Sequence, residues 1–120
     1  MKLPRPDHPI TIVPNKNQVR VTLAGKVIAD TTRALTLIEA SYPPVQYIPR
    51  VDANMVALAR TAHATHCPYK GDASYFTISA VMAAENAVWS YEQPFPAVKE
   101  IAGYLAFYPN RVDAIEQTPA

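Results

Sequence analysis

The sequence predicts a single, mainly β domain over residues 1–120, with about eight short strands and two short helices. Apolar and polar residues alternate in short segments, which is typical of strands with one buried face. Twelve prolines cut the chain into short pieces and disfavour long helices. With 49% hydrophobic and 18% charged residues, the chain is globular and can form one core. That core is expected to span about residues 10–116, between loose ends at residues 1–8 and 117–120.

Four strands are predicted in the N-terminal half of the chain. Val19, Val21 and Leu23 share one face of the first strand, and Gly25 lies in a hairpin turn to the second. Prolines end the third and the fourth segment, since proline cannot continue a strand ladder. The predicted strands are residues 18–23, 26–30, 34–39 and 45–48.

Four more strands are predicted in the C-terminal half. Phe76, Ile78 and Ala80 lie on one face of the first of them. A turn at residues 84–86 precedes the second, and a turn at residues 109–111 is expected to join the last two as a hairpin. The predicted strands are residues 74–80, 87–91, 105–108 and 112–115.

Two segments have helical signals. Asp52 can cap a helix over residues 53–60, whose apolar positions recur at helical spacing. Pro96 can open a second helix over residues 97–102, because proline is favoured at the first helical position. Both helices are short, so the class stays mainly β.

Composition excludes several functions. The net charge is +1 and no basic stripe is present, so no nucleic-acid partner is expected. The three glycines lie far apart, so the chain has no glycine-rich phosphate cradle and no cofactor is expected. No apolar run approaches ~20 residues, so no membrane partner is expected. A lone cysteine and a start without a signal-peptide pattern indicate a cytoplasmic protein.

The run THCPYKGDASY, residues 65–75, holds many reactive side chains around one predicted turn. Pro68 favours an extended backbone at Cys67, so the side chains of His66 and Cys67 should point to opposite sides. Gly71 can supply a positive φ in the turn. Asp72 and Ser74 are then expected to bond amides of the turn itself.

Several short motifs, taken in order, resemble a known family. The most specific is CPYKGDASY at residues 67–75. The others are VIAD at 27–30 with Arg33-Ala34, YIPR at 47–50, ENAVWSY at 85–91 and IAGYLAFYPNRV at 101–112. Together they cover residues 10–116, and the chain resembles the domain of unknown function 427 family, which also carries a nucleotidyltransferase label.

The resemblance implies a compact fold similar to the tent-shaped β sheets of zinc-carrying Mss-four-like proteins. Those proteins bind metal through paired CxxC motifs, whereas this chain has one cysteine, so no zinc site is carried over. Known nucleotidyl transfer sites hold two metals on an Asp-x-Asp pair beside a Gly-Ser turn. This sequence has neither pattern, so its residues give the nucleotidyltransferase label little support.

The leading functional hypothesis is a small-ligand-binding pocket at the 65–75 turn. A mixture of cations and aromatic rings suits a small anionic or ring-bearing ligand. Trp89 and Tyr91 are two residues apart and so share one strand face. The candidate binding residues are Arg33, Tyr47, Arg50, His66, Cys67, Tyr69, Lys70, Asp72 and Trp89.

Three other hypotheses stay open. In the first, the turn is a rigid polar corner and Cys67 is buried as a small hydrophobe. In the second, the protein is a transferase-type enzyme that uses Lys70, His66 or a Cys67 nucleophile, which needs a base within reach. In the third, it is a structural or protein-interaction domain, for example a homodimer through an edge strand. A metal site on His63, His66 and Cys67 lacks an obvious fourth ligand, so no metal is predicted.

Overall fold

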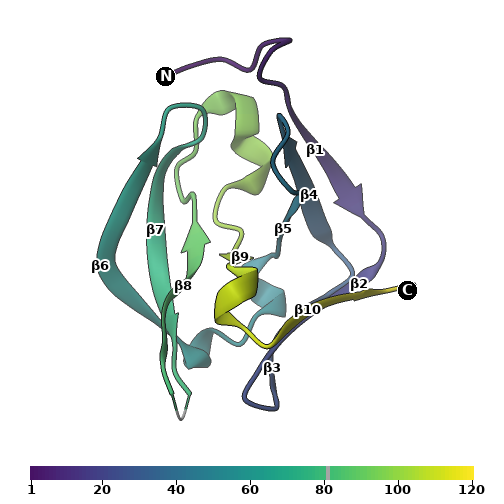
Figure 1. The fold of residues 1–120 in the computed structure, drawn as a ribbon, viewed down its shortest axis with the longest axis vertical. Coiled ribbons are helices and arrows are strands. Elements are labelled where there is room, and N and C mark those ends of the chain that lie inside the picture. Colours follow the sequence, from purple (N-terminus) through teal and green to yellow (C-terminus); the bar gives the residue numbers. More distant parts are fainter. Residues whose placement is uncertain (81) are drawn as a thin grey trace.

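The protein is a mainly β domain, as predicted, in a computed structural model that describes residues 1–80 and 82–120. These residues form ten strands in three antiparallel sheets (Figure 1). The first sheet contains β1 (Ile10–Asn15), β4 (Ala34–Glu39) and β5 (Val45–Tyr47). The second contains β10 (Ala114–Thr118), β2 (Gln18–Leu23) and β3 (Lys26–Thr31). The third contains β6 (Leu58–Cys67), β7 (Gly71–Ile78), β8 (Ala84–Ser90) and β9 (Ala106–Phe107).

The helical segments are short 3-10 turns. They are η1 (Arg50–Asp52), η2 (Met55–Ala57), η3 (Pro96–Ile101) and η4 (Pro109–Arg111). The predicted helix over residues 97–102 corresponds to η3, which Pro96 opens. No helix among the described residues is long and apolar enough to cross a membrane.

Two neighbouring hydrophobic clusters form the core. Tyr47 and Ile48 are adjacent in the chain, yet Tyr47 packs in one cluster and Ile48 in the other. Leu105 and Ala106 divide in the same way. Because successive side chains of an extended chain point to opposite faces, one short segment can supply both clusters. Backbone hydrogen bonds in both directions between Ile48 and Leu105, 2.7 and 2.8 Å long, join the two segments.

The predicted helix over residues 53–60 is wrong. Residues 58–60 belong to β6, and the residues before them are tied to β3 by a hydrogen bond of 2.8 Å from the Asn54 amide to the Ile28 carbonyl. That bond and the Ala29–Ala53 bridge hold Ala53 extended, and residues 55–57 form only the 3-10 turn η2, so tertiary pairing overrides the helical spacing. β6 was not predicted because alanine, arginine and histidine weaken its strand pattern.

The predicted last hairpin is also wrong. β9 pairs with β8, whereas β10 pairs with β2 in another sheet. The turn at residues 109–111 therefore connects two sheets. The predicted turn at residues 84–86 is instead the start of β8, with a positive φ of 49° at Asn86.

The ends of the chain are more ordered than predicted. β10 extends to Thr118, and β1 forms a strand that the sequence did not reveal. Backbone hydrogen bonds join Arg5 and His8 in a small loop, and the Lys2 amide donates to the Pro68 carbonyl at 2.7 Å. Residues 1–9, here called the N-terminal arm, therefore pack on the turn between β6 and β7.

Replacing Ile48 by Ala should lower the free energy of unfolding by about 2–5 kcal/mol, because it leaves a cavity where the core clusters meet. Ile48 is 1% exposed. The matched control is Val51→Ala, since Val51 is 80% exposed and should cost less than about 0.5 kcal/mol. Urea unfolding of both variants measures the difference. Equal losses would contradict the assigned position of Ile48.

Candidate functional site

The turn between β6 and β7 directs its polar side chains to two different places. Gly71 has a φ of 107°, as predicted for the residue that closes the turn. The imidazole of His66 lies on the outside, where its Nδ1 is 2.7 Å from a carboxylate oxygen of Asp72. The ammonium of Lys70 points inward and forms an ion pair with the Glu39 carboxylate on β4. The turn thus contributes Lys70, and not His66, to the interior.

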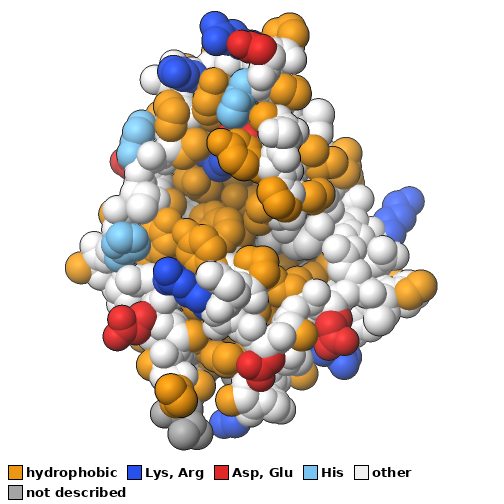
Figure 2. Space-filling model, viewed as in Figure 1, with side chains coloured by type: hydrophobic (Ala, Val, Ile, Leu, Met, Phe, Trp, Pro, Cys, Tyr) orange, Lys and Arg blue, Asp and Glu red, His pale blue; other side chains and the backbone are white. Residues whose placement is uncertain are grey.

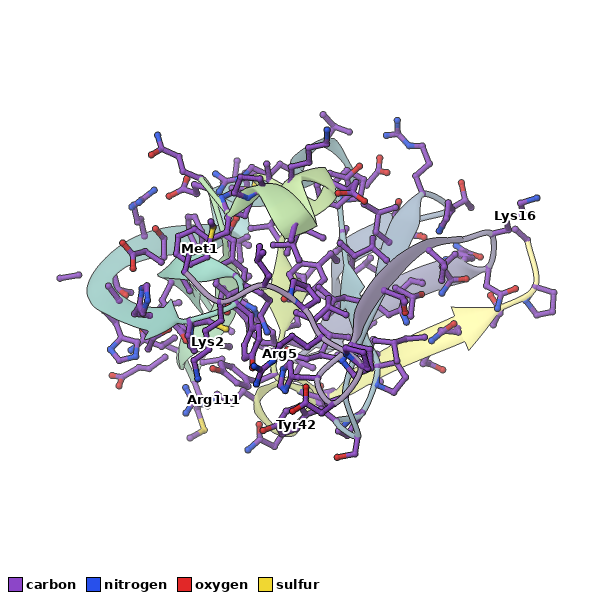
Figure 3. All side chains as sticks on the ribbon, turned by 90° about the horizontal axis from the view of Figure 1, so that it is seen from above. Met1, Lys2, Arg5, Lys16, Tyr42 and Arg111 are labelled. Carbon is purple, nitrogen blue, oxygen red and sulfur yellow. The ribbon has the colours of Figure 1, made fainter. Side chains whose placement is uncertain are left out.

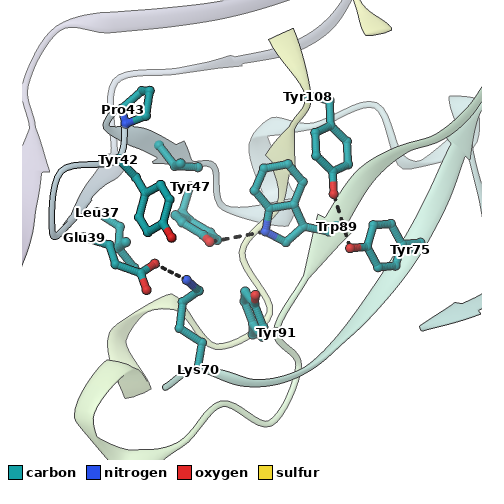
Figure 4. Close-up of a pocket in the computed structure, with 11 residues that line it drawn as sticks. Leu37, Glu39, Tyr42, Pro43, Tyr47, Lys70, Tyr75, Trp89, Tyr91 and Tyr108 are labelled. Atoms are coloured by element: carbon teal, nitrogen blue, oxygen red, sulfur yellow. Dashed lines mark hydrogen bonds and ion pairs between the residues drawn. The ribbon is translucent and has the colours of Figure 1, made fainter. Parts of the chain in front are cut away.

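Lys70 and Glu39 lie at one end of a cavity of about 170 Å³ (Figure 4). Its walls are mostly aromatic side chains from β5, β7, β8 and the loops after β4 and β9. We call this cavity the aromatic pocket. The aromatic residues that line it are Tyr42, Tyr47, Tyr75, Trp89, Tyr91 and Tyr108. A cavity of about 150 Å³ holds a benzene ring in a protein core, so this one has room for a single ring.

Hydrogen bonds fix several of these walls. The Trp89 indole N–H donates to the Tyr47 hydroxyl at 3.3 Å, and the Tyr75 and Tyr108 hydroxyls are 3.3 Å apart. Tyr91 lies beside the cation of Lys70, whose Nζ is 5.8 Å from the ring centroid. The hydroxyl of Tyr91 has no hydrogen-bond partner among the described residues and points into the space between the rings (Figure 4). It is therefore available to a ligand.

Burial raises the pKa of three tyrosines of the pocket. It raises the pKa of Tyr47 and of Tyr91 far above the ordinary value of 10. Burial and the hydrogen bond with Tyr75 raise the pKa of Tyr108 to about 12. At neutral pH these groups are uncharged and can donate as well as accept hydrogen bonds.

The charges in the pocket neutralise each other. The side chains of Glu39 and Lys70 are each 12% exposed, and the other carboxylate oxygen of Glu39 is 2.8 Å from Nε2 of His8. Burial opposes ionisation of Glu39, but the hydrogen bonds and charges of Lys70 and His8 outweigh it, so the pKa of Glu39 is below its ordinary value of 4.5. Glu39 is therefore ionised at neutral pH, and its partners offset the cost of removing a part-buried carboxylate from water.

Three of the predicted site residues, Tyr47, Lys70 and Trp89, line the aromatic pocket together. Tyr69 does not line it. Its ring stacks on His8 of the N-terminal arm, with centroids 4.0 Å apart and an interplanar angle of 7°. The N-terminal arm thus contacts the pocket region through His8, which touches both Tyr69 and Glu39.

The predicted arginines lie elsewhere and have carboxylate partners. Arg33 donates to Asp52 at 3.1 Å on the surface. Arg50 donates to Glu92 at 3.0 Å and to the Gly103 carbonyl at 2.7 Å. Neither arginine lines the aromatic pocket. Both arginines therefore form ion pairs outside the pocket.

Cys67 lies on the interior side, opposite to His66 as expected, whereas Asp72 and Ser74 do not make the bonds expected at the turn. Cys67 is half-buried and packs against the core cluster that includes Tyr47. Asp72 bonds His66, and Ser74 accepts from Arg60 at 2.9 Å, whereas bonds to amides of the turn were expected. No group of three or more His, Cys, Asp or Glu residues in the described part of the chain could hold a metal ion.

Sequence reasoning missed Glu39 and four tyrosines of the pocket. Tyr42, Tyr75 and Tyr108 belong to segments far apart in the sequence, and nothing local indicates that they meet. Tyr91 had a usable signal, because it is two residues from Trp89 and the chain has seven tyrosines. Aromatic pairs on alternate strand positions indicate either a core or the wall of a pocket.

One face of the molecule has a hydrophobic hollow (Figure 2). Figure 2 shows hydrophobic side chains gathered in a hollow near the centre of one face, with charged groups mostly around it. Tyr42, Arg5 and Arg111 lie along the same side of the molecule, whereas Lys16 lies at the far end (Figure 3). Tyr42 is 63% exposed and also lines the aromatic pocket, so its ring lies at the opening.

Replacing Glu39 by Gln should lower the free energy of unfolding at neutral pH by about 1–3 kcal/mol, because Lys70 loses its charged partner. The pKa of Glu39 is lower in the folded than in the unfolded state. Its ionised form therefore stabilises the fold above about pH 4.5, and this contribution is lost as the pH falls through the folded pKa. The free energy of unfolding, measured from urea unfolding curves between about pH 7 and pH 3, should therefore fall less with decreasing pH in the variant than in the original chain.

The control for this experiment is Glu100→Gln, at an exposed position on η3. This variant should keep the stability of the original chain within about 0.5 kcal/mol. If Glu39→Gln and Glu100→Gln have the same stability at neutral pH, the buried ion pair does not stabilise the fold.

Family comparison agrees with the motifs in the sequence. A family model described as domain of unknown function 427 matches residues 11–118, nearly the whole chain. No curated protein matches the chain. The predicted resemblance to this family is confirmed, whereas the similarity to tent-shaped Mss-four-like proteins stays a prediction. The chain belongs to the domain of unknown function 427 family.

Proposed function

We propose that the protein is a small-molecule-binding module and that the aromatic pocket binds a small, uncharged ligand with one ring. The observation that carries the proposal is a cavity of about 170 Å³ that is walled by aromatic side chains and closed by a neutralised ion pair. Ligand sites are typically concave and apolar, with a few polar groups that fix orientation. The hydroxyl of Tyr91 is such a group.

Charge favours a neutral ligand over an anion. Among the residues that line the pocket, Glu39 and Lys70 are the charged ones, and they pair with each other. An anion would have to compete with Glu39 for Lys70, and the raised pKa of Tyr91 reflects surroundings in which negative charge is disfavoured. A neutral ring with a hydroxyl or carbonyl group avoids both costs.

Two arrangements support binding over the transferase hypothesis. Lys70 and His66 have different partners, Glu39 and Asp72, and the His66–Asp72 pair is on the exposed side of the turn. Nucleophilic catalysis by Cys67 needs a base within hydrogen-bond reach, and no hydrogen bond to Cys67 is present among the described side chains. No contact among the described residues favours the interaction-domain hypothesis over ligand binding.

Phenol is a suitable probe, and Trp89 is a built-in reporter because it is the one tryptophan of the chain. Phenol should bind with a Kd on the order of 1 mM and shift the indole N–H resonance of Trp89 in an NMR titration. Tyr91→Phe keeps the ring but removes the free hydroxyl, so it should weaken binding about fivefold.

The matched control is Tyr69→Phe, which removes the same group from a tyrosine that stacks on His8 outside the pocket. It should leave the affinity for phenol unchanged. If saturating phenol does not move the Trp89 resonance, the proposal is wrong. If Tyr69→Phe weakens binding as much as Tyr91→Phe, phenol binds elsewhere.

A further inference from the structure

A second, larger cavity lies between β5 and β10, the facing edges of two different sheets. Its volume is about 470 Å³, and we call it the β5–β10 groove. Its lining includes three side chains that belong to the core, Val21, Ile48 and Phe107. Small-molecule sites usually have about 300–1,000 Å³ and apolar walls, so the groove has the dimensions of a binding site.

The groove and the aromatic pocket are neighbours. Val45 and Trp89 line both cavities. Trp89 is fixed between them, because its indole N–H donates to the Tyr47 hydroxyl and its ring packs on Tyr108 with centroids 4.5 Å apart. The two cavities are therefore adjacent across a shared wall, and a molecule that reaches from one to the other contacts Val45 and Trp89.

Two amide groups in the groove are oriented by one asparagine. Nδ2 of Asn15 donates to the side-chain oxygen of Gln46 on β5 at 3.0 Å and to that of Gln117 on β10 at 2.9 Å. The Gln46 oxygen also accepts from the Thr36 hydroxyl at 2.8 Å. With both oxygens engaged, the NH₂ groups of Gln46 and Gln117 have no partner among the described residues and remain available as donors.

The charge of the groove is small. Asp113 is the charged residue among those that line it, and one of its carboxylate oxygens accepts from the Ala24 amide at 2.8 Å. The groove thus combines an apolar floor with amide donors. These features select an uncharged, mainly apolar chain that carries a hydrogen-bond acceptor such as an amide or ester carbonyl.

We propose that the β5–β10 groove is a second subsite, and that one elongated ligand occupies both cavities across Trp89. Its ring lies in the aromatic pocket, and its apolar chain, with a carbonyl oxygen, lies in the groove near Gln46 and Gln117. This inference rests on the proposed function, because it needs the aromatic pocket to bind the ring.

Two probes separate the two subsites. Phenol fits the aromatic pocket alone, and N-butyl-4-hydroxybenzamide adds a carbonyl and a four-carbon chain to the same ring. The longer probe should bind at least about tenfold more tightly, since each added CH₂ that is buried favours binding. Both probes should shift the Trp89 indole resonance and compete with each other.

Variants of β10 test whether the carbonyl and the four-carbon chain of the longer probe bind in the groove. Ala114→Phe fills the groove, so it should bring the affinity for the longer probe down to that for phenol and leave phenol binding within about twofold. Gln117→Leu keeps the size of the side chain but removes the donor, and it should weaken the longer probe about threefold to fivefold. The matched control is Gln93→Leu, because Gln93 is exposed and lines neither cavity.

The outcomes distinguish the two proposals. If neither probe moves the Trp89 resonance, the proposed function fails. If phenol binds but the longer probe binds no more tightly, the second subsite is wrong. It is also wrong if the longer probe binds more tightly and neither Ala114→Phe nor Gln117→Leu reduces that gain. Loss of the gain in Gln117→Leu, with no loss in Gln93→Leu, supports the subsite even if Ala114→Phe does not fold.

Discussion

The ion pair between Glu39 and Lys70 connects parts of the molecule that are far apart in the sequence. Glu39 ends β4 in the first sheet, and Lys70 lies in the turn of the third sheet, 31 residues later. His8 adds the N-terminal arm to the same carboxylate. A part-buried charge is unfavourable without a partner, so the contact between these three segments stabilises the closed arrangement of the sheets. The aromatic pocket lies directly beside this contact.

The tyrosines allow one region to serve as core and as cavity wall. Tyr47, Tyr75 and Tyr91 belong to a buried cluster and also line the pocket. A tyrosine ring packs like a hydrophobic side chain, while its hydroxyl bonds another side chain or a ligand. The walls formed by these three tyrosines are therefore held by the same packing that stabilises the domain.

The sequence revealed elements that follow local rules and missed those that depend on distant partners. β2, β3 and β4 were predicted from alternation, and the positive φ of Gly71 from its place in a turn. The helix over residues 53–60 was predicted wrongly because the bond from Asn54 to β3 and the pairing of β6 with β7 override its helical spacing. The rest of β6 was missed because alanine, arginine and histidine weaken its strand pattern. Of the pocket, Tyr47, Lys70 and Trp89 were predicted as site residues, but Glu39 was not, because nothing near it in the chain indicates its partner.

We propose that the neutralised pair of Glu39 and Lys70 makes the aromatic pocket selective for uncharged rings. The decisive experiment is to compare the calorimetric affinities of phenol, benzoate and benzylammonium at one low ionic strength, where salt screening is weakest. Phenol should bind most tightly, and both ions should bind weakly. Tighter binding of benzoate or of benzylammonium would contradict this proposal, because one member of the pair would then act as a free charge.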